Sequence, residues 1–353
     1  MHRPKGLYVI DSEFFESVYG PEERETIERM VHILDPGVHS AKSIRLRPDL
    51  LAQCEVLFTG WGCPKLDVDF LSGAPRLKLV LYASGTTREI ISEEMWNRKI
   101  LLSSSYVANA LPVVEYTLAM IFFSLKHGWH YALKTKRDGC YPKRTPVPGC
   151  YGTTVGLVSM GMVARFLCEK LRPFDLQLVV FDPFLSAEEA REYNVRRVGL
   201  RELFEISDVV SIHSPALPET EGLVTGELVA AMKPGATLIN TARGSIIRED
   251  ELIEVVAGRP DLQIVLDVTE PEPPVPGSPL YHLPNVVLTP HIAGSMDLEC
   301  RRMSQAMIEE LHRYLKGEPL RWSITPELAS ISSHRPAFMN GAAHPSKKEK
   351  VFT

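Results

Sequence analysis

The sequence feature that most limits the possible folds is a regular alternation of short apolar strands with helix-like segments. Nine runs rich in valine, isoleucine and leucine lack the alternating polar positions of a half-exposed strand, so we expect both of their faces to be covered. Strands and helices that alternate through short connections favour parallel sheets with right-handed crossovers. We therefore predict an α/β fold. The expected strands are 7–10, 55–60, 77–83, 154–158, 176–182, 208–213, 236–242, 263–268 and 285–291.

The number of strands and the chain length both point to two domains. Nine strands are more than a single sheet usually contains, and 353 residues are enough for two domains of ordinary size. The segment 136–152 is rich in glycine, proline and basic residues and precedes a new apolar strand, as a domain junction would. We expect residues 111–127 to form a long helix that leads from one domain to the other. The other expected helices are 22–34, 91–99, 162–172, 249–258 and 297–316.

Composition excludes several classes of partner and site. The formal net charge of −5 gives no reason to expect a nucleic-acid or acidic-membrane partner. The six cysteines have no regular spacing, so we expect reduced thiols in a cytoplasmic protein. We expect no signal peptide, since Asp11 and Glu13 interrupt the first apolar stretch, and no membrane span, since no run of about 18 apolar residues occurs. His127 and His130 lack a partner at metal-ligand spacing, so no metal is expected.

A candidate nucleotide-binding loop follows the expected strand 154–158. The dinucleotide fingerprint places three glycines at such a strand-to-helix turn, and this chain has Ser159, Gly161 and Ala164 at those positions. The middle glycine, which lets the backbone approach a pyrophosphate, is present, and alanine is an accepted third residue. Asp182 ends the next strand, where an acidic residue holds the adenosine ribose. The loop therefore predicts dinucleotide binding, against the alternative that Asp182 merely caps a turn before Pro183.

Four later blocks of sequence carry a family resemblance. They read SDVVSIHSPALPETEGLV (207–224), MKPGATLINTARGSIIREDEL (232–252), VLDVTEPEPP (265–274) and LPNVVLTPHIAGS (283–295). In this order and spacing they resemble the D-isomer-specific 2-hydroxyacid dehydrogenase family, and the resemblance covers most of residues 77–325. The family's arginine, glutamate and histidine correspond to Arg243, Glu272 and His291. The chain departs from the family at Ser159, where glycine is usual, and in the substrate loop 83–88.

The resemblance implies a domain organisation. A Rossmann-type cofactor domain, 116–296, is inserted into a flavodoxin-like substrate domain made of residues 1–115 and 297–325, and both are doubly wound. Residues 326–353 are expected to form a flexible tail. A homodimer formed through the cofactor domains is expected from the family.

The three aligned side chains suit hydride transfer between NAD(H) and a small D-2-hydroxy acid or 2-keto acid. His291 would act as general acid and base, because imidazole works in both directions near neutral pH. Glu272 beside it would orient the ring and favour imidazolium. Arg243 would bind the substrate carboxylate and polarise its carbonyl through a guanidinium fork. Taken singly, each has an ordinary alternative: a surface arginine, a solvated loop carboxylate and a core histidine.

The resemblance also implies which residues contact the cofactor and the substrate. NAD is preferred to NADP because Asp182 would repel a 2′-phosphate and residues 183–185 supply no cation to bind one. Backbone amides of Ser84, Gly85 and Thr86 would bind the substrate carboxylate with Arg243. We expect His213 to be structural, and Trp61, Tyr82, Arg88 and Trp129 are candidates for the substrate pocket. The expected cofactor contacts are Gly161, Met162, Val163, Asp182, Ser214, Thr220, Thr241, Ala242, Arg243, Asp267, His291 and Gly294.

One alternative function stays open at this point. The family includes transcriptional co-repressors, so the chain could instead be a nicotinamide-sensing binding protein on the same scaffold. Steady-state oxidation of NADH with a panel of keto acids separates the two, because a sensor would bind NADH without turnover. The departures at Ser159 and in the loop 83–88 leave the substrate side chain open.

Overall fold

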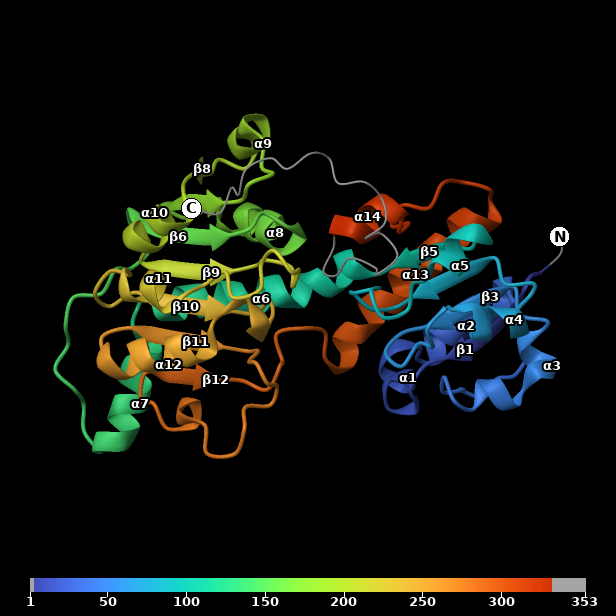
Figure 1. Cartoon of the computed structure of the whole chain (residues 1–353), viewed down its shortest axis with the longest axis horizontal. Coiled ribbons are helices and arrows are strands. Elements are labelled where there is room, and N and C mark those ends of the chain that lie inside the picture. Colours follow the sequence, from blue (N-terminus) through green and yellow to red (C-terminus); the bar gives the residue numbers. More distant parts are fainter. Residues whose placement is uncertain (1–2, 332–353) are drawn as a thin grey trace. The chain divides into compact units, whose positions relative to one another are not determined.

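The computed structural model describes residues 3–331, and its chain forms two compact units that are each built on a parallel sheet (Figure 1). One unit runs to Ala110 and resumes at Ser295, and the other spans Leu111–Gly294. The predicted fold class is confirmed. The boundaries lie a few residues before the expected positions at 115 and 296.

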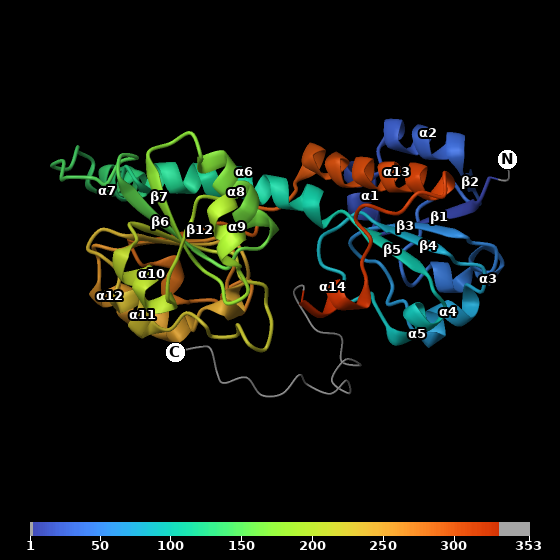
Figure 2. The same cartoon turned by 90° about the horizontal axis from the view of Figure 1, so that it is seen from above.

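The first unit contains a five-stranded parallel sheet with the strand order β2-β1-β3-β4-β5, the flavodoxin-like order. Helices cover both faces, with α1, α2 and α13 on one and α3, α4 and α5 on the other (Figure 2). The strands are β1 (Lys5–Val9), β2 (His32–Ile33), β3 (Val56–Thr59), β4 (Leu79–Tyr82) and β5 (Leu101–Ser104). The helices are α1 (Ser12–Val18), α2 (Pro21–Met30), α3 (Pro48–Leu51), α4 (Val68–Gly73), α5 (Glu93–Asn97), α13 (Arg301–Leu315) and α14 (Pro326–Ile331).

The second unit contains a seven-stranded parallel sheet ordered β12-β11-β10-β9-β6-β7-β8. The order reverses between β6 and β9, so ligands are expected beyond the carboxyl ends of these strands. Helices α6, α8 and α9 pack on one face and α10, α11 and α12 on the other (Figure 2). The strands are β6 (Thr153–Val158), β7 (Leu176–Phe181), β8 (Arg196–Arg197), β9 (Val209–Ile212), β10 (Thr237–Asn240), β11 (Gln263–Leu266) and β12 (Val286–Leu288). The helices are α7 (Gly128–Asp138), α8 (Met162–Leu171), α9 (Ala187–Glu192), α10 (Leu200–Ile206), α11 (Gly226–Ala230) and α12 (Glu249–Gly258).

Helix α6 (Tyr106–Ser124) is continuous across the boundary at Ala110. It begins five residues before the predicted start, because it continues through Pro112, a residue more common in a first turn. By length and composition α6 could cross a membrane, a test that core helices also pass. Its apolar residues Val114 and Ile121 are buried in the core of the second unit, and 33% of its apolar window is buried. It is the one such helix within residues 3–331.

The first six residues of the predicted tail are helical. Residues 326–331 form α14, whose Ala329 is buried in the core of the first unit. The hydroxyl of Thr325 caps this helix by accepting the N–H of Leu328 at 3.2 Å. The cap and the burial of Ala329 together explain why this segment is helical, although its apolar residues show no clear helical spacing. The rest of the predicted tail, 332–353, lies outside the described residues.

Candidate active site

The loop after β6 has the backbone shape of a dinucleotide-binding turn, although serine replaces its first glycine. Ser159 adopts a φ of +75°, which costs a non-glycine residue roughly 1–2 kcal/mol. Its hydroxyl lies 2.8 Å from that of Ser214, and its N–H donates to the Phe181 carbonyl at 2.8 Å. A Cβ added to Gly161 would meet only the His213 carbonyl, at 3.9 Å. The space before the N-terminus of α8 is therefore open, and its amides can receive a phosphate.

Asp182, which follows β7, ties the cofactor loop to its own loop. One carboxylate oxygen accepts the N–H of Met160 at 2.7 Å, and the other accepts those of Phe184 at 2.7 Å and Leu185 at 3.2 Å. A carboxylate has about four acceptor positions, so capacity remains for a ribose hydroxyl. Asp182 therefore shapes the cofactor loop, and its contact with a ribose stays a prediction.

Arg243 lies beyond the carboxyl end of β10 and is fixed by its neighbours. The buried Asn240 side chain donates to the Arg243 carbonyl at 2.9 Å and accepts the Ala242 N–H at 3.0 Å. A Cβ on Gly244 would lie 2.0 Å from the Thr269 carbonyl carbon, so the chain after β11 packs against this glycine. Burial lowers the pKa of the Arg243 guanidinium, an effect that the Glu272 carboxylate opposes.

Glu272 and His291 form a hydrogen-bonded pair beyond the ends of β11 and β12. His291 Nδ1 lies 2.6 Å from Glu272 Oε1, and the two side chains are 46% and 40% exposed. A carboxylate only accepts, so Nδ1 carries the hydrogen and Nε2 is left to face a ligand. His291 has a φ of +53°, a conformation that needs support from its surroundings.

That support comes from Asp267, whose side chain is buried. Its carboxylate accepts the Thr289 hydroxyl at 2.6 Å and the N–H groups of Ile292 and Ala293, each at 2.9 Å. The Asp267 carbonyl accepts the N–H of His291 at 3.0 Å. These bonds show that the Asp267 carboxylate holds the loop that carries His291. The cofactor contact expected for Asp267 stays a prediction.

Other predicted cofactor residues lie in the same unit and mostly shape loops. The Thr220 hydroxyl accepts the Leu217 N–H at 2.9 Å, which closes the turn after β9. The Thr241 hydroxyl lies 3.2 Å from that of Thr117. Met162 and Val163 open helix α8, and nothing lies within 4 Å of a Cβ placed on Gly294. Burial lowers the pKa of His213 to about 4, so this histidine is neutral at pH 7, as suits the structural role expected for it.

The predicted substrate loop belongs to the first unit, beyond β4. The Ser104 hydroxyl donates to the carbonyls of Ser84 (2.7 Å) and Gly85 (2.9 Å), and the Ser84 N–H donates to the Tyr82 carbonyl at 2.9 Å. The Ser84 N–H therefore already has a partner within the unit. Binding of a substrate carboxylate by the amides of Gly85 and Thr86 stays a prediction.

Among the pocket candidates, Trp61 lies beyond β3 with its ring 4.9 Å from that of Phe14. Tyr82 is buried in the core of the first unit and Trp129 packs against the core of the second. These two aromatic residues therefore serve packing.

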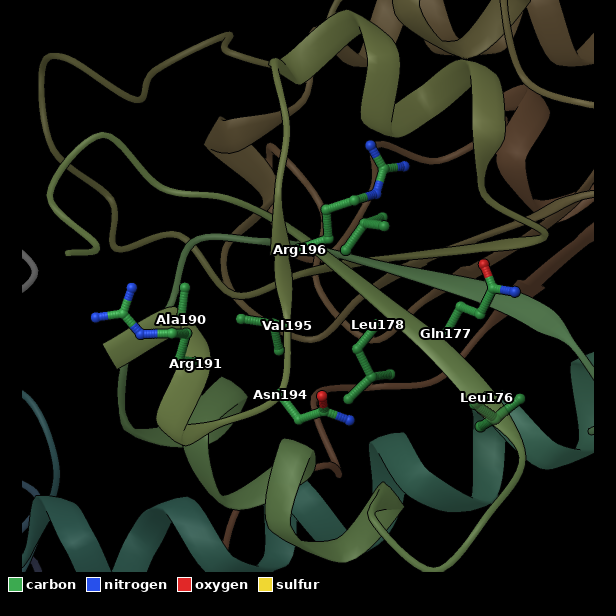
Figure 3. A pocket seen from close by; sticks show the side chains of 9 residues that line it. Leu176, Gln177, Leu178, Ala190, Arg191, Asn194, Val195 and Arg196 are labelled. Carbon is green, nitrogen blue, oxygen red and sulfur yellow. The ribbon is translucent and has the colours of Figure 1, made fainter. Parts of the chain in front are cut away.

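A surface hollow lies away from the predicted residues, along β7, α9 and β8 (Figure 3). It exists because β8 pairs with only Val179 and Val180, leaving the start of β7 uncovered at the sheet edge. Asp182 follows the opposite end of β7, so the hollow is not part of the candidate site. Within residues 3–331, no group of three or more histidine, cysteine or acidic side chains could hold a metal.

Comparison with known proteins places this geometry in a family. A family model described as "D-isomer specific 2-hydroxyacid dehydrogenase, NAD binding domain" matches residues 118–293. The (S)-sulfolactate dehydrogenase of Chromohalobacter salexigens is 35% identical over 209 residues, covering 59% of this chain and 67% of that protein. The chain belongs to the D-isomer-specific 2-hydroxyacid dehydrogenase family. The second unit is its NAD-binding domain.

Other relatives differ in length or resemble the chain in fold. The D-3-phosphoglycerate dehydrogenase of Bacillus subtilis is 31% identical over 262 residues, 74% of this chain and 49% of that protein. The chain thus spans about half the length of the phosphoglycerate dehydrogenases it matches. The TT0316 protein of Thermus thermophilus covers 91% of this chain and 100% of its own at a TM-score of 0.71 and 26% identity. The D-mandelate dehydrogenase of Rhodotorula graminis, 22% identical, covers 92% of this chain and 98% of its own; its TM-score of 0.75 shows the same fold.

NAD fits the residues of this family member. The open space before Gly161 and the free start of α8 suit a pyrophosphate, and Asp182 lies beyond the neighbouring strand.

The sequence analysis did not identify Asn240, Thr289 and Tyr116, whose side chains hold the Arg243 and His291 loops. Asn240 could have been found, because an asparagine that ends a buried strand must satisfy its amide locally.

Proposed function

We propose that this chain is an NAD-dependent dehydrogenase that interconverts a small D-2-hydroxy acid and the matching 2-keto acid. The observation that carries the proposal is the 2.6 Å bond between His291 and Glu272. Their loops follow β12 and β11, and Arg243 follows β10, the next strand of the sheet. An acid–base pair beside a half-buried guanidinium suits a substrate that has a carboxylate next to a carbonyl.

Each of the three side chains has one role in keto-acid reduction. The nicotinamide supplies the hydride when the cofactor is bound. His291 donates a proton from Nε2 to the keto oxygen, while Glu272 holds the ring through Nδ1 and stabilises imidazolium. Arg243 binds the substrate carboxylate and draws charge toward the carbonyl oxygen. In the oxidative direction His291 accepts the hydroxyl proton.

The cofactor preferred is NAD(H). Asp182 would repel a 2′-phosphate, and Pro183-Phe184-Leu185 offers no cation to pair with it. A solved relative, the acyclic imino acid reductase described as binding NADPH and D-Arg, shows that the fold also accepts the phosphorylated cofactor. The carboxylate of Asp182 is thus the feature on which this preference rests.

A homodimer and a cytoplasmic location complete the proposal. Leu133 of helix α7 is 38% exposed, and Tyr141 and Tyr151, which follow this helix in the chain, are 93% and 87% exposed. Such a surface on the NAD-binding domain suits a second copy of the chain. Light scattering should give twice the chain mass of 39.5 kDa, and a monomer would refute the dimer.

Turnover of a substrate panel tests the proposed activity. The panel contains the keto acids that correspond to lactate, mandelate, 3-phosphoglycerate and sulfolactate, which are the substrates named for relatives. NADH oxidation with at least one of them is expected. Tight NADH binding without turnover on any would instead favour the nicotinamide-sensing alternative, which no observation on this chain supports.

A further inference from the structure

Two consecutive residues of α6 bond to the two loops that carry the proposed catalytic side chains. The Tyr116 hydroxyl lies 2.7 Å from the Thr289 hydroxyl, two residues before His291. The Thr117 hydroxyl lies 3.2 Å from the Thr241 hydroxyl, two residues before Arg243. Neither α6 residue was predicted from the sequence to take part in the site.

The direction of the first link follows from proton counting. Thr289 donates its hydrogen to the Asp267 carboxylate at 2.6 Å, so its remaining bond with Tyr116 is one that it accepts. The Tyr116 hydroxyl therefore donates to the Thr289 hydroxyl, which in turn donates to the Asp267 carboxylate. Burial raises the pKa of the Tyr116 phenol, so it keeps this hydrogen throughout the working pH range. Asp267 in turn receives the N–H groups of Ile292 and Ala293, next to His291.

The second link lies deeper in the unit. Thr117 is fully buried and Thr241 nearly so, which strengthens a hydrogen bond between them. Neighbouring residues of a helix point about 100° apart. Two adjacent side chains can therefore reach the ends of β10 and β12, which are separated by β11 and hence by about 10 Å.

We propose that Tyr116 and Thr117 are positioning residues that fasten the Arg243 and His291 loops to α6 and so fix the separation of these two side chains. The inference rests on the proposed function, because the separation of His291 and Arg243 matters only if both act on the same substrate. His291 sits in a left-handed backbone conformation and is held from one side by Asp267. A displacement of about 1 Å at a reacting group can cost on the order of 100-fold in rate.

Single hydroxyl deletions test each link separately. Tyr116→Phe should lower kcat for phenylglyoxylate and pyruvate about 5- to 10-fold, the effect of one hydrogen bond, while KM for NADH changes less than twofold. Thr117→Val should raise KM for the keto acid about 5-fold, because Arg243 binds the carboxylate. Thr117→Ser, which keeps the hydroxyl, should restore KM to within twofold of the parent.

A readout that needs no turnover accompanies the kinetics. Two-bond proton–nitrogen NMR correlations report which ring nitrogen of His291 carries the hydrogen. Where the ring is neutral, the parent should show mainly the Nδ1–H form, because that hydrogen is donated to Glu272. Tyr116→Phe should show a clear increase in the Nε2–H form, since the ring is then held less firmly.

Matched controls separate positioning from general destabilisation. Tyr131→Phe removes an exposed tyrosine hydroxyl bonded to Thr145, and Thr153→Val removes a buried threonine hydroxyl bonded to the Gly149 carbonyl at 2.9 Å. Both controls should keep the kinetics and the His291 spectrum of the parent. The inference is overturned if Tyr116→Phe and Thr117→Val behave like these controls, or if the controls lose as much activity. Loss of activity in His291→Ala with no change in Tyr116→Phe would remove this inference alone and leave the proposed function standing.

Discussion

Ser159 offers a quantitative test of the cofactor loop that is independent of substrate. Its φ of +75° costs roughly 1–2 kcal/mol for a residue with a Cβ, and its bond to Ser214 returns about 1 kcal/mol. Alanine would keep the backbone strain and lose the bond, so Ser159→Ala should lower the free energy of unfolding by about 1 kcal/mol. Glycine would lose the bond and the strain, and would add roughly 0.5–1 kcal/mol of chain entropy. Ser159→Gly should therefore stay within about 0.5 kcal/mol of the parent.

Urea unfolding at pH 7 measures both variants, with the dependence on denaturant required to stay equal. A double-mutant cycle adds the partner: in a Ser214→Ala background, Ser159→Ala should cost less than about 0.3 kcal/mol, because the bond is already gone. The reasoning would be refuted if Ser159→Ala were as stable as the parent, or if Ser159→Gly were less stable than Ser159→Ala.

Three further outcomes follow from the site. Glu272→Gln should lower kcat for keto-acid reduction, since a neutral amide in place of the carboxylate holds the His291 ring less firmly; an unchanged kcat would contradict the pairing. His213 resists protonation in the fold with a pKa of about 4, against 6.5 when unfolded, so its contribution is intact above pH 6.5 and is lost as the pH falls toward 4. His213→Gln should remove roughly 2 kcal/mol of the stability difference between pH 7 and pH 4.5, measured by urea unfolding; an unaltered difference would show that His213 is accessible to protons. The ratio of kcat/KM for NADH over NADPH should exceed 10, and Asp182→Ala should reduce it; a parent that uses NADPH equally well would refute the preference.

The sequence alone predicts each strand that lies in a continuous run of apolar residues. It failed at β2, β5 and β8, of which β2 and β8 have only two residues each. Strand β5 was missed because Ser103 and Ser104 make it look polar. Both serines are buried, and their hydroxyls bond to Glu310 and to the carbonyl of Ser84, respectively. Such bonds depend on partners far along the chain, so no local pattern reveals them.

In the candidate site, too, residues in local motifs could be predicted and residues that act through tertiary contacts could not. Arg243, Glu272 and His291 could be predicted because each lies in a short motif, and the structure brings Glu272 and His291 into contact. The hydrogen bonds that the Asp267 carboxylate accepts, and those of the Tyr116 and Thr117 hydroxyls, could not be predicted. Their roles depend on α6 packing beside the ends of β10 and β12, which is a tertiary arrangement.

The most direct test of the proposed chemistry is the turnover of His291→Ala beside that of His282→Ala, a control that removes an exposed histidine of the same unit. Single acid–base groups contribute about 10²–10⁴-fold, so His291→Ala should lose at least 100-fold in kcat on the best keto acid of the panel. NADH affinity, followed by fluorescence titration, should stay within twofold in both variants, and His282→Ala should keep parental turnover. A His291→Ala protein that retained more than a tenth of parental kcat would show that the proton comes from another group.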